Sequence, residues 1–328
     1  MRTPRTAGTT TGTPTVQGSS GEGLAIRRAH FADTIAFHAP GLRRYRTDEY
    51  TAHDPHEFVS ISLTGRGCAL NCDHCGTEVL KGMAALPRAE DSLFDLCAQA
   101  AAKGAQGVLI SGGCDAQGRV PLLRHVPDLL RARRELGLKV RVHPGLPDAQ
   151  TCAALAEVGI DGAMVDIIGH ADTIRDVYHL GASVADYDTM LADLGRFGVP
   201  AVPHIVLGLH YGQLLGEWEA LEIVARHPRK LLVLVVLMPL SGTPMAQVQP
   251  PPAEQVGAFF ETARRRLPDT PIVLGCARPM GDYKTTVDRL AIDAGLNGIA
   301  YPGQGIVAYA REQGLEPRFH NACCGVGW

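Results

Sequence analysis

The chain has 328 residues, of which 45% are hydrophobic and 20% are charged, and its formal net charge is −3. This size and composition fit a globular protein with one large α/β domain or two ordinary domains. The near-neutral charge creates no field that would attract nucleic acid. The richest apolar run, Leu231–Leu240, is too short to cross a membrane.

The cysteines and the N-terminal residues bear on the cellular compartment. The nine cysteines are an odd number, and the first twenty residues contain no apolar stretch of the kind found in a signal peptide. We therefore expect a reducing, cytoplasmic compartment, in which clustered cysteines serve a metal or a reaction. The first twenty residues are rich in Thr, Gly, Pro and Arg, which predicts a disordered tail, with a targeting segment as the alternative. Residues 1–56 are predicted to be this tail and a lead-in segment.

From about residue 57, strand-like and helix-like segments alternate. The predicted strands are Phe58–Leu63, Gly107–Ile110, Lys139–His143, Gly162–Ile168, Pro200–Leu207, Leu231–Leu237, Pro271–Gly275 and Asn297–Tyr301. The predicted helices are Pro87–Lys103, Pro121–Leu136, Asp148–Val158, Val184–Phe197, Gly216–His227, Ala253–Leu267, Lys284–Ala294 and Gln304–Gln313, and Asp148 is the expected N-cap of the third. Near-continuous apolar strands between helices indicate a parallel sheet that is buried on both faces.

Eight strand–helix repeats predict a closed (βα)8 barrel of the TIM type over residues 57–328. The alternative is a six-stranded partial barrel followed by a separate C-terminal piece, but no linker-like segment supports that division. Such barrels carry their chemistry in the loops that follow the strands. Motifs at the C-terminal ends of the predicted strands are therefore the candidates for a site.

The loop after the first predicted strand contains Cys68, Cys72 and Cys75 within eight residues. Three thiolates with the spacing Cys-x3-Cys-x2-Cys can bind three irons of a [4Fe–4S] cluster and leave the fourth iron open to a small ligand. A zinc site is the alternative, but its fourth ligand would have to be Asp73 or His74, inside the same tight loop.

This motif resembles that of the radical S-adenosylmethionine (SAM) superfamily, in which an aromatic residue usually precedes the third cysteine. His74 stands at that position here. The resemblance implies a [4Fe–4S] cluster on the three cysteines and SAM bound at the open iron. It also implies an electron donor such as ferredoxin or flavodoxin, and cleavage of SAM to a 5′-deoxyadenosyl radical.

Short loops with glycine or polar residues follow the next four predicted strands. The residues in them or at the strand ends that we predict to contact SAM are Ser111, Gly112, Gly113, His143, Asp166, Gly208 and His210. In the superfamily, a glycine pair after the second strand receives the amino group of the methionine part, and a glycine-containing segment after the fifth strand lies against the adenine. The alternatives are a plain turn for the glycines and ordinary core positions for Asp166 and His210. The sequence singles out no further catalytic side chain.

Three further segments resemble the sulfur-inserting branch of the superfamily. Met238–Met245 resembles a loop of biotin synthase, and Cys276 and Arg278 stand where biotin synthase carries an arginine that binds its second cluster. The C-terminal segment His320–Trp328 contains two adjacent cysteines that could fold back over the barrel mouth. This branch takes sulfur from an auxiliary iron–sulfur cluster that is sacrificed.

The resemblance therefore implies a second cluster. Its candidate ligands are Cys114, Cys276, Cys323 and Cys324, with a buried, inert thiol as the alternative for each. Cys97 and Cys152 fall within predicted helices, away from the strand ends, and we interpret them as buried thiols.

Together these segments look most like a subunit of the two-component lipoyl synthases. That resemblance implies an octanoyl chain on a lipoyl carrier protein as the substrate, sulfur insertion at its carbons, and a homologous partner subunit. One alternative is another full-barrel radical SAM enzyme, of a biotin synthase-like or cofactor-maturing type. A second alternative is a non-enzymatic iron–sulfur carrier. Neither a nucleic-acid partner nor a membrane partner is expected.

Overall fold

The computed structural model describes residues 21–39, 45–50, 57–86 and 91–325. Its strands are β1 (Thr34–His38), β2 (Phe58–Ser62), β3 (Ala84–Ala85), β4 (Gly107–Ser111), β5 (Lys139–Val142), β6 (Gly162–Asp166), β7 (Ala201–Leu207), β8 (Leu232–Val236), β9 (Ile272–Leu274), β10 (Gly298–Ala300) and β11 (Glu316–His320). They form one sheet with the order β11-β1-β10-β9-β8-β7-β6-β5-β4-β2-β3, in which all neighbours are parallel.

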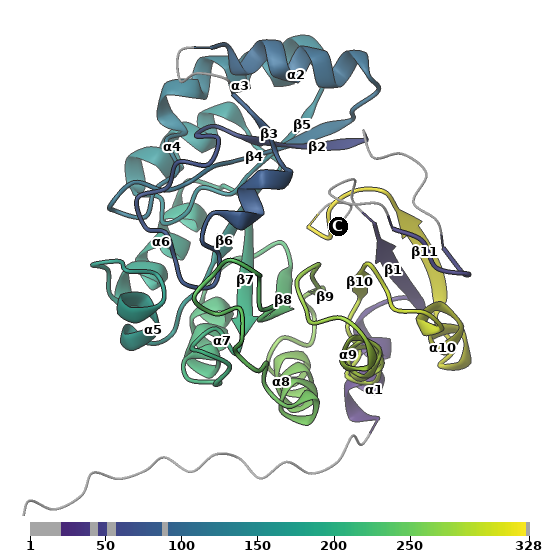
Figure 1. Cartoon of the computed structure of the whole chain (residues 1–328). Helices are drawn as coiled ribbons and strands as arrows, with labels where there is room; N and C mark the ends of the chain where they lie inside the picture. Colours follow the sequence, from purple (N-terminus) through teal and green to yellow (C-terminus); the bar gives the residue numbers. More distant parts are fainter. Residues whose placement is uncertain (1–20, 40–44, 51–56, 87–90, 326–328) are drawn as a thin grey trace, which may run out of the picture.

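The helices connect successive strands. They are α1 (Glu22–His30), α2 (Leu93–Ala102), α3 (Val126–Leu136), α4 (Ala149–Val158), α5 (Ala171–Asp176), α6 (Val184–Arg196), α7 (Glu217–Arg226), α8 (Ala253–Arg266), α9 (Asp282–Asp293) and α10 (Ile306–Glu312), with short 3-10 turns η1 (Glu78–Gly82) and η2 (Leu123–His125). Figure 1 shows the helices along the outer side of a curved sheet that surrounds a central space. This is the α/β barrel of the TIM type that the sequence predicts.

The eight predicted strands are confirmed as β2 and β4 to β10, and they belong to one sheet. The alternative of a six-stranded barrel with a separate C-terminal piece is therefore wrong. The closure differs from the prediction, because β1 and β11 extend the sheet beyond β10 and no pairing between β11 and β3 is described within residues 21–325. Neither α1 nor β1 was expected in the lead-in segment.

The strands alternate between two apolar layers. On β4, Val108 and Ile110 pack under the helices, whereas Leu109 points into the central space with Phe58 of β2 and Val233 of β8. Residues of both layers are buried, as a parallel sheet covered on both faces requires. The central space is thus a packed core below the mouth of the barrel.

Local signals define the helix ends that carry the strand-end loops. The Asp148 carboxylate accepts a hydrogen bond from the Thr151 backbone N–H at 2.9 Å and caps α4, as the sequence predicts. Gly159 ends the same helix in the left-handed region at φ 69°. Ser183 and Asp186 form a capping box at the start of α6.

The chain after β11 turns into the central space. Ala322, Cys323 and Cys324 pack there with the inward-facing residues of the strands, and Figure 1 shows this segment between β11 and β2. A Cβ at Gly325 would lie 2.8 Å from the Met164 side chain on β6. The C-terminal segment is therefore part of the barrel core.

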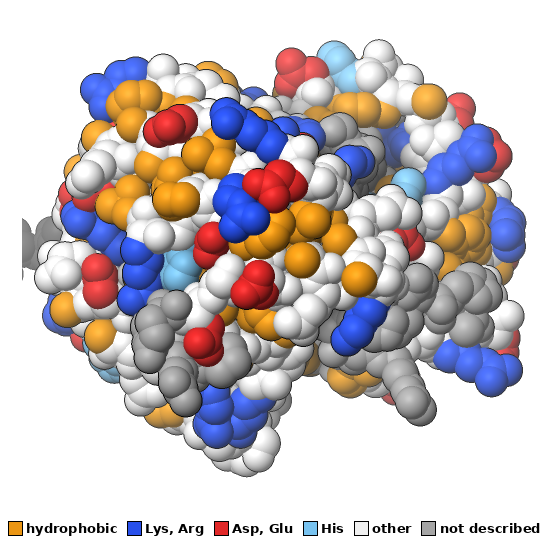
Figure 2. Space-filling view, turned by 90° about the horizontal axis from the view of Figure 1, so that it is seen from above, with side chains coloured by type: hydrophobic (Ala, Val, Ile, Leu, Met, Phe, Trp, Pro, Cys, Tyr) orange, Lys and Arg blue, Asp and Glu red, His pale blue; other side chains and the backbone are white. Residues whose placement is uncertain are grey.

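Among the described residues, no helix combines the length and the apolar character that a membrane crossing needs. Figure 2 looks down on the molecule from above and shows acidic and basic side chains interspersed over that face.

Candidate functional site

The cysteine loop leaves the end of β2 and is held to the end of β4. The backbone N–H of Leu63 donates to the Ser111 carbonyl at 2.8 Å, and that of Ala69 donates to the Cys114 carbonyl at 2.8 Å. Within the loop, the Gly76 N–H donates to the Cys72 carbonyl at 2.8 Å. These bonds fix the loop at the C-terminal edge of the sheet, where barrels of this type carry their sites.

The thiols of this loop lie in a poorly solvated pocket. Burial raises the pKa of Cys72, and the thiols of Cys68, Cys75 and Cys114 raise it further. Burial likewise raises the pKa of Cys75, and it raises that of Cys114 to about 12, with Cys68 as the next cause. Four thiols thus lie within electrostatic reach of one another, and binding of a cluster would release their protons.

These thiols do not form a site for a single metal ion in the described part of the chain. In the described part of the chain, no three His, Cys, Asp or Glu side chains are close enough together to hold one metal ion. A zinc site requires that arrangement. A cubane takes one thiolate on each iron, so its cysteines lie farther apart. The zinc alternative therefore has no support in the geometry.

A cavity of about 570 Å3 opens above the cysteine loop. Of the residues predicted to contact SAM, those that line it are Ser111, Gly112, Gly113, His143 and Asp166. The cysteines that line it are Cys68, Cys72, Cys75, Cys114 and Cys276. Most of the other lining is apolar, which is usual for a small-molecule site.

Gly113 is required for packing against the cysteine loop. A Cβ at this position would lie 1.9 Å from the Gly67 carbonyl oxygen and 2.5 Å from the Cys68 Cβ. Its N–H donates to the Thr64 hydroxyl at 2.7 Å. Glycine here lets two strand-end loops meet, whereas the sequence suggested close approach to a ligand or a plain turn.

Gly208 and His210 are not among the residues that line the cavity. The Gly208 N–H donates to the buried Glu217 carboxylate at 2.8 Å, and a Cβ there would lie 2.4 Å from the Pro251 ring. The His210 Nδ1 lies 3.2 Å from the Thr173 hydroxyl. Both residues therefore shape the loop after β7, which is the ordinary structural role left open by the sequence.

A polar aromatic group forms one wall of the cavity, and it adds two tyrosines that the sequence did not single out to His74 and Asp166. The His74 ring lies 5.0 Å from the Tyr178 ring, and the Tyr178 hydroxyl donates to the Asp166 carboxylate at 3.1 Å. Burial lowers the pKa of His74, so its neutral form is favoured. Tyr187 completes this wall. Tyr178 follows α5, which comes after the end of β6, and this position beyond a strand end was its signal in the sequence.

The second group of thiols lies deeper in the barrel. Cys276 lines the cavity and acts electrostatically on Cys324, which is buried next to Cys323. The hydrogen bond from Cys324, the backbone of Gly325 and the Arg141 guanidinium lower the pKa of Cys323. The structure therefore groups Cys276 with the tail pair, whereas Cys114 lies with the cysteines of the first loop.

Arg141 on β5 is the cation of this second group. It is 2% exposed, and its guanidinium donates to the Gly325 carbonyl. Its Nε is buried without a hydrogen-bond partner among the described residues. Thiolate character at Cys323 and Cys324 favours the charged guanidinium, which burial disfavours. A single arginine inside a strand gave no sequence signal for this role.

Arg278 does not face the cavity. Its Nε donates to the Asp288 carboxylate at 2.6 Å, and its two terminal nitrogens donate to the Gly275 carbonyl at 2.7 Å and the Tyr301 carbonyl at 3.1 Å. Lys284 pairs with the same carboxylate at 3.0 Å. Arg278 therefore ties the loop after β9 to α9 and is not among the residues that line the cavity, unlike the cluster-binding arginine that the resemblance to biotin synthase implies.

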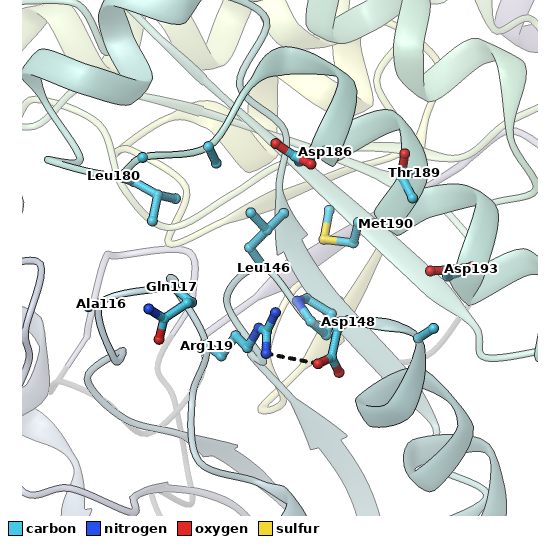
Figure 3. A pocket seen from close by; sticks show the side chains of 14 residues that line it. Ala116, Gln117, Arg119, Leu146, Asp148, Leu180, Asp186, Thr189, Met190 and Asp193 are labelled. Carbon is cyan, nitrogen blue, oxygen red and sulfur yellow. Dashed lines mark ion pairs between the residues drawn. The ribbon is translucent and has the colours of Figure 1, made fainter.

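A second hollow, of about 460 Å3, lies beside the mouth. Leu146 and Leu180 line both hollows. Figure 3 shows its polar side, where the Arg119 guanidinium faces the Asp148 carboxylate at 2.8 Å and Asp186 and Asp193 project from α6. No thiol is among its lining residues, so the cysteine chemistry belongs to the first cavity.

The fold and the site together define an iron–sulfur barrel enzyme with its cluster loop after the first barrel strand. Residues 62–222 match the Radical SAM superfamily, and this stretch, which contains the three cysteines and the strand-end loops up to β7, is a radical SAM domain. The cofactors of this domain are a [4Fe–4S] cluster and SAM, and Cys68, Cys72 and Cys75 are the residues that fit the cluster.

Curated relatives of similar sequence are biotin synthases. The chain is 25% identical to the mitochondrial biotin synthase of Emericella nidulans over 239 residues, which covers 69% of this chain and 59% of that protein. It is 24% identical to the biotin synthase of Beijerinckia indica over 265 residues, covering 75% of this chain and 79% of that protein. The chain thus spans less than two thirds of the fungal relative.

Solved structures of similar fold have low sequence identity. Methylornithine synthase (PylB) superposes with a TM-score of 0.60 at 15% identity, covering 90% of this chain and 87% of that one. The FeFe-hydrogenase maturase HydG from Carboxydothermus hydrogenoformans superposes with a TM-score of 0.61 at 14% identity, covering 92% and 72%. These similarities support the barrel fold.

Proposed function

We propose that this protein is a radical SAM sulfurtransferase that inserts sulfur into the octanoyl chain of a lipoyl carrier protein. The observation that carries the proposal is the presence of two thiol groups around one cavity. Cys68, Cys72, Cys75 and Cys276 line it, and Cys276 packs against the same core cluster as Cys323 and Cys324. One group serves to make a radical and the other to deliver sulfur.

The division of labour follows from the chemistry of an unactivated C–H bond. A bound cluster and SAM would supply the radical that removes the hydrogen atom. The protein must then present sulfur to the carbon radical and keep water away. Cys276, Cys323 and Cys324, with the Arg141 guanidinium beside the tail pair, are the proposed site of an auxiliary cluster that holds this sulfur. Packing of Ala322 and Cys324 in the barrel core excludes solvent from it.

The lining of the cavity favours an acyl chain as substrate. Its apolar residues include Leu70, Val79, Leu80, Met83, Val120, Leu146, Leu180 and Met238. No Lys or Arg is among the described residues that line it, so an uncharged alkyl chain suits it better than a small acid. Val79 is 52% exposed at the rim, where a chain carried by another protein would enter.

A biotin synthase-like reaction is the second candidate, because the curated relatives carry that name. The two reactions share radical formation and sulfur insertion, and they differ in the substrate. The proposal also includes two protein partners, because the resemblances described above imply them. They are a homologous partner subunit and an electron donor such as ferredoxin or flavodoxin.

The test is anaerobic reconstitution with iron and sulfide, followed by dithionite, SAM and an octanoylated carrier peptide. We expect 5′-deoxyadenosine together with a mass increase of the peptide that corresponds to added sulfur. If sulfur appears on a biotin precursor and not on the peptide, the second candidate is correct. Formation of 5′-deoxyadenosine with both substrates unchanged would contradict sulfur insertion while leaving the radical SAM domain intact.

A separate experiment tests whether a partner subunit takes part. The same reaction is run with and without a homologous second radical SAM protein, and single and double sulfur additions are resolved by mass. Addition of one sulfur by this chain alone, completed by the second protein, is the expected result. Two additions by this chain alone would remove the partner from the proposal.

A further inference from the structure

Cys114 is a fourth thiol beside the three cysteines of the radical SAM loop. It lines the same cavity as Cys68, Cys72 and Cys75, and Cys68 is the neighbouring charge that acts on it most strongly. Cys276 and Cys323, by contrast, act on the pKa of Cys324. Cys114 therefore lies with the cysteines of the radical SAM loop and not with the C-terminal cysteines that are proposed to bind the auxiliary cluster.

The position of Cys114 is fixed from several sides. Its backbone N–H donates to the Cys68 sulfur at 3.3 Å, and its carbonyl accepts from the Ala69 N–H at 2.8 Å. Its own sulfur lies 3.1 Å from the point where a Cβ of Gly145 would be. The absence of a side chain at Gly145 therefore leaves the space that this thiol occupies.

Three cysteines leave one iron of a cubane without a protein ligand, and a thiolate is a strong ligand for such an iron. We propose that Cys114 is a reversible fourth ligand of the radical SAM cluster, which binds the open iron when SAM is absent and leaves it when SAM binds. This inference rests on the radical SAM domain and is independent of the proposed sulfur insertion.

The exchange is a ligand substitution without change of oxidation state. On binding iron, the Cys114 thiol loses its proton to solvent and forms an iron–sulfur bond. When the amino and carboxylate groups of SAM take the same iron, that bond breaks and the thiolate regains a proton. Cys114 thereby protects the cluster from loss of its fourth iron until SAM binds.

The experiment measures how readily the cluster loses that iron. Reconstituted protein freed of SAM is treated with ferricyanide, and the [3Fe–4S] product is measured by its electron paramagnetic resonance. We expect little product from the native chain and a several-fold larger amount from Cys114→Ala. Added SAM should protect the variant, because SAM then occupies the iron. The matched control is Cys152→Ala, which removes a buried thiol in α4 outside the cavity and should behave as the native chain.

Two additional variants make the result easier to interpret. Carrying Cys323→Ala in every sample removes signal from the proposed second cluster, and Cys114→Ser provides a variant with a weaker ligand and nearly unchanged volume. Equal [3Fe–4S] yields from the native chain and both Cys114 variants would overturn the inference. Iron is also counted in Cys114→Ala without the Cys323→Ala change. The inference is wrong if that variant loses about four irons per chain while still cleaving SAM, because Cys114 would then belong to the auxiliary cluster.

Discussion

The two thiol groups of this barrel are built in different ways. Cys68, Cys72 and Cys75 lie in one short loop, and that loop is fastened to the end of β4 by backbone hydrogen bonds. Cys276 comes from the loop after β9, whereas Cys323 and Cys324 come from the segment after β11 that enters the barrel core. The first group depends on local chain geometry and the second on the completed fold. A change in one group should therefore leave the other measurable.

The largest effect is expected from Cys72→Ala. This cysteine is buried and lines the cavity, and two thiolates are insufficient to retain a site-differentiated cubane. SAM cleavage should fall to background, and iron should drop by about four per chain. Iron analysis and chromatography of 5′-deoxyadenosine measure both. Residual SAM cleavage at a substantial fraction of the native rate would show that Cys72 is not a cluster ligand.

The next effect separates the two groups. The double change Cys323→Ala and Cys324→Ala should abolish sulfur transfer and remove about four irons per chain, while SAM cleavage continues. Cys97→Ala, in a fully buried thiol on α2, is the matched control and should change neither quantity. Loss of SAM cleavage together with sulfur transfer would mean that the groups are not independent.

The fold was largely predictable because its signals are local. All eight barrel strands were identified from apolar runs, and Asp148 was recognised as a helix cap from its residue type and position. The strands β1 and β11 were not predicted. Thr34–His38 is short and pairs with β10 and β11, which are far away in sequence, so its strand character comes from tertiary pairing.

The site was predictable only where its residues are contiguous. The three cysteines of the first loop could be identified from spacing alone, and the glycine pair from its place after a strand. Arg141 gave no such signal, because an arginine at that point of a strand becomes informative only when Gly325 is known to lie beside it. Arg278 shows the opposite error: its resemblance to a ligand position was local, but its partner Asp288 is supplied by α9.

The role of Arg278 can be tested through stability. Asp288 is fully buried and neutralises Arg278 and Lys284, so Asp288→Asn leaves two buried charges without their anion. We expect a loss of about 3–5 kcal/mol in the free energy of unfolding, measured by chemical denaturation. Iron per folded chain should remain unchanged, because this network lies behind the cavity wall.

An exposed ion pair provides the matched control. Glu222 pairs with Arg266 at 3.0 Å on the surface between α7 and α8, and Glu222→Gln should cost about 0–1 kcal/mol. If Asp288→Asn instead lowers the iron content and leaves the unfolding free energy near that of Glu222→Gln, the network contributes to the second cluster and the structural assignment of Arg278 is wrong.

The smallest expected effect concerns the cavity wall formed by His74, Tyr178, Asp166 and Tyr187. Tyr178→Phe removes the hydroxyl that donates to Asp166 at 3.1 Å and should cost about 1 kcal/mol in the free energy of unfolding. Asp166 also lines the cavity, so water can replace the lost donor and keep the cost at this level. Tyr187→Phe, at a buried tyrosine of the same wall, removes a hydroxyl that makes no hydrogen bond within the part of the chain that the structure describes, and should cost less. Equal losses in the two variants would show that the bond to Asp166 contributes nothing to the wall. Tyr178→Phe could instead lose much more unfolding free energy than Tyr187→Phe and also bind SAM more weakly. That result would show that the Tyr178 hydroxyl holds the Asp166 carboxylate in position, because an unpaired carboxylate would reorient within the cavity.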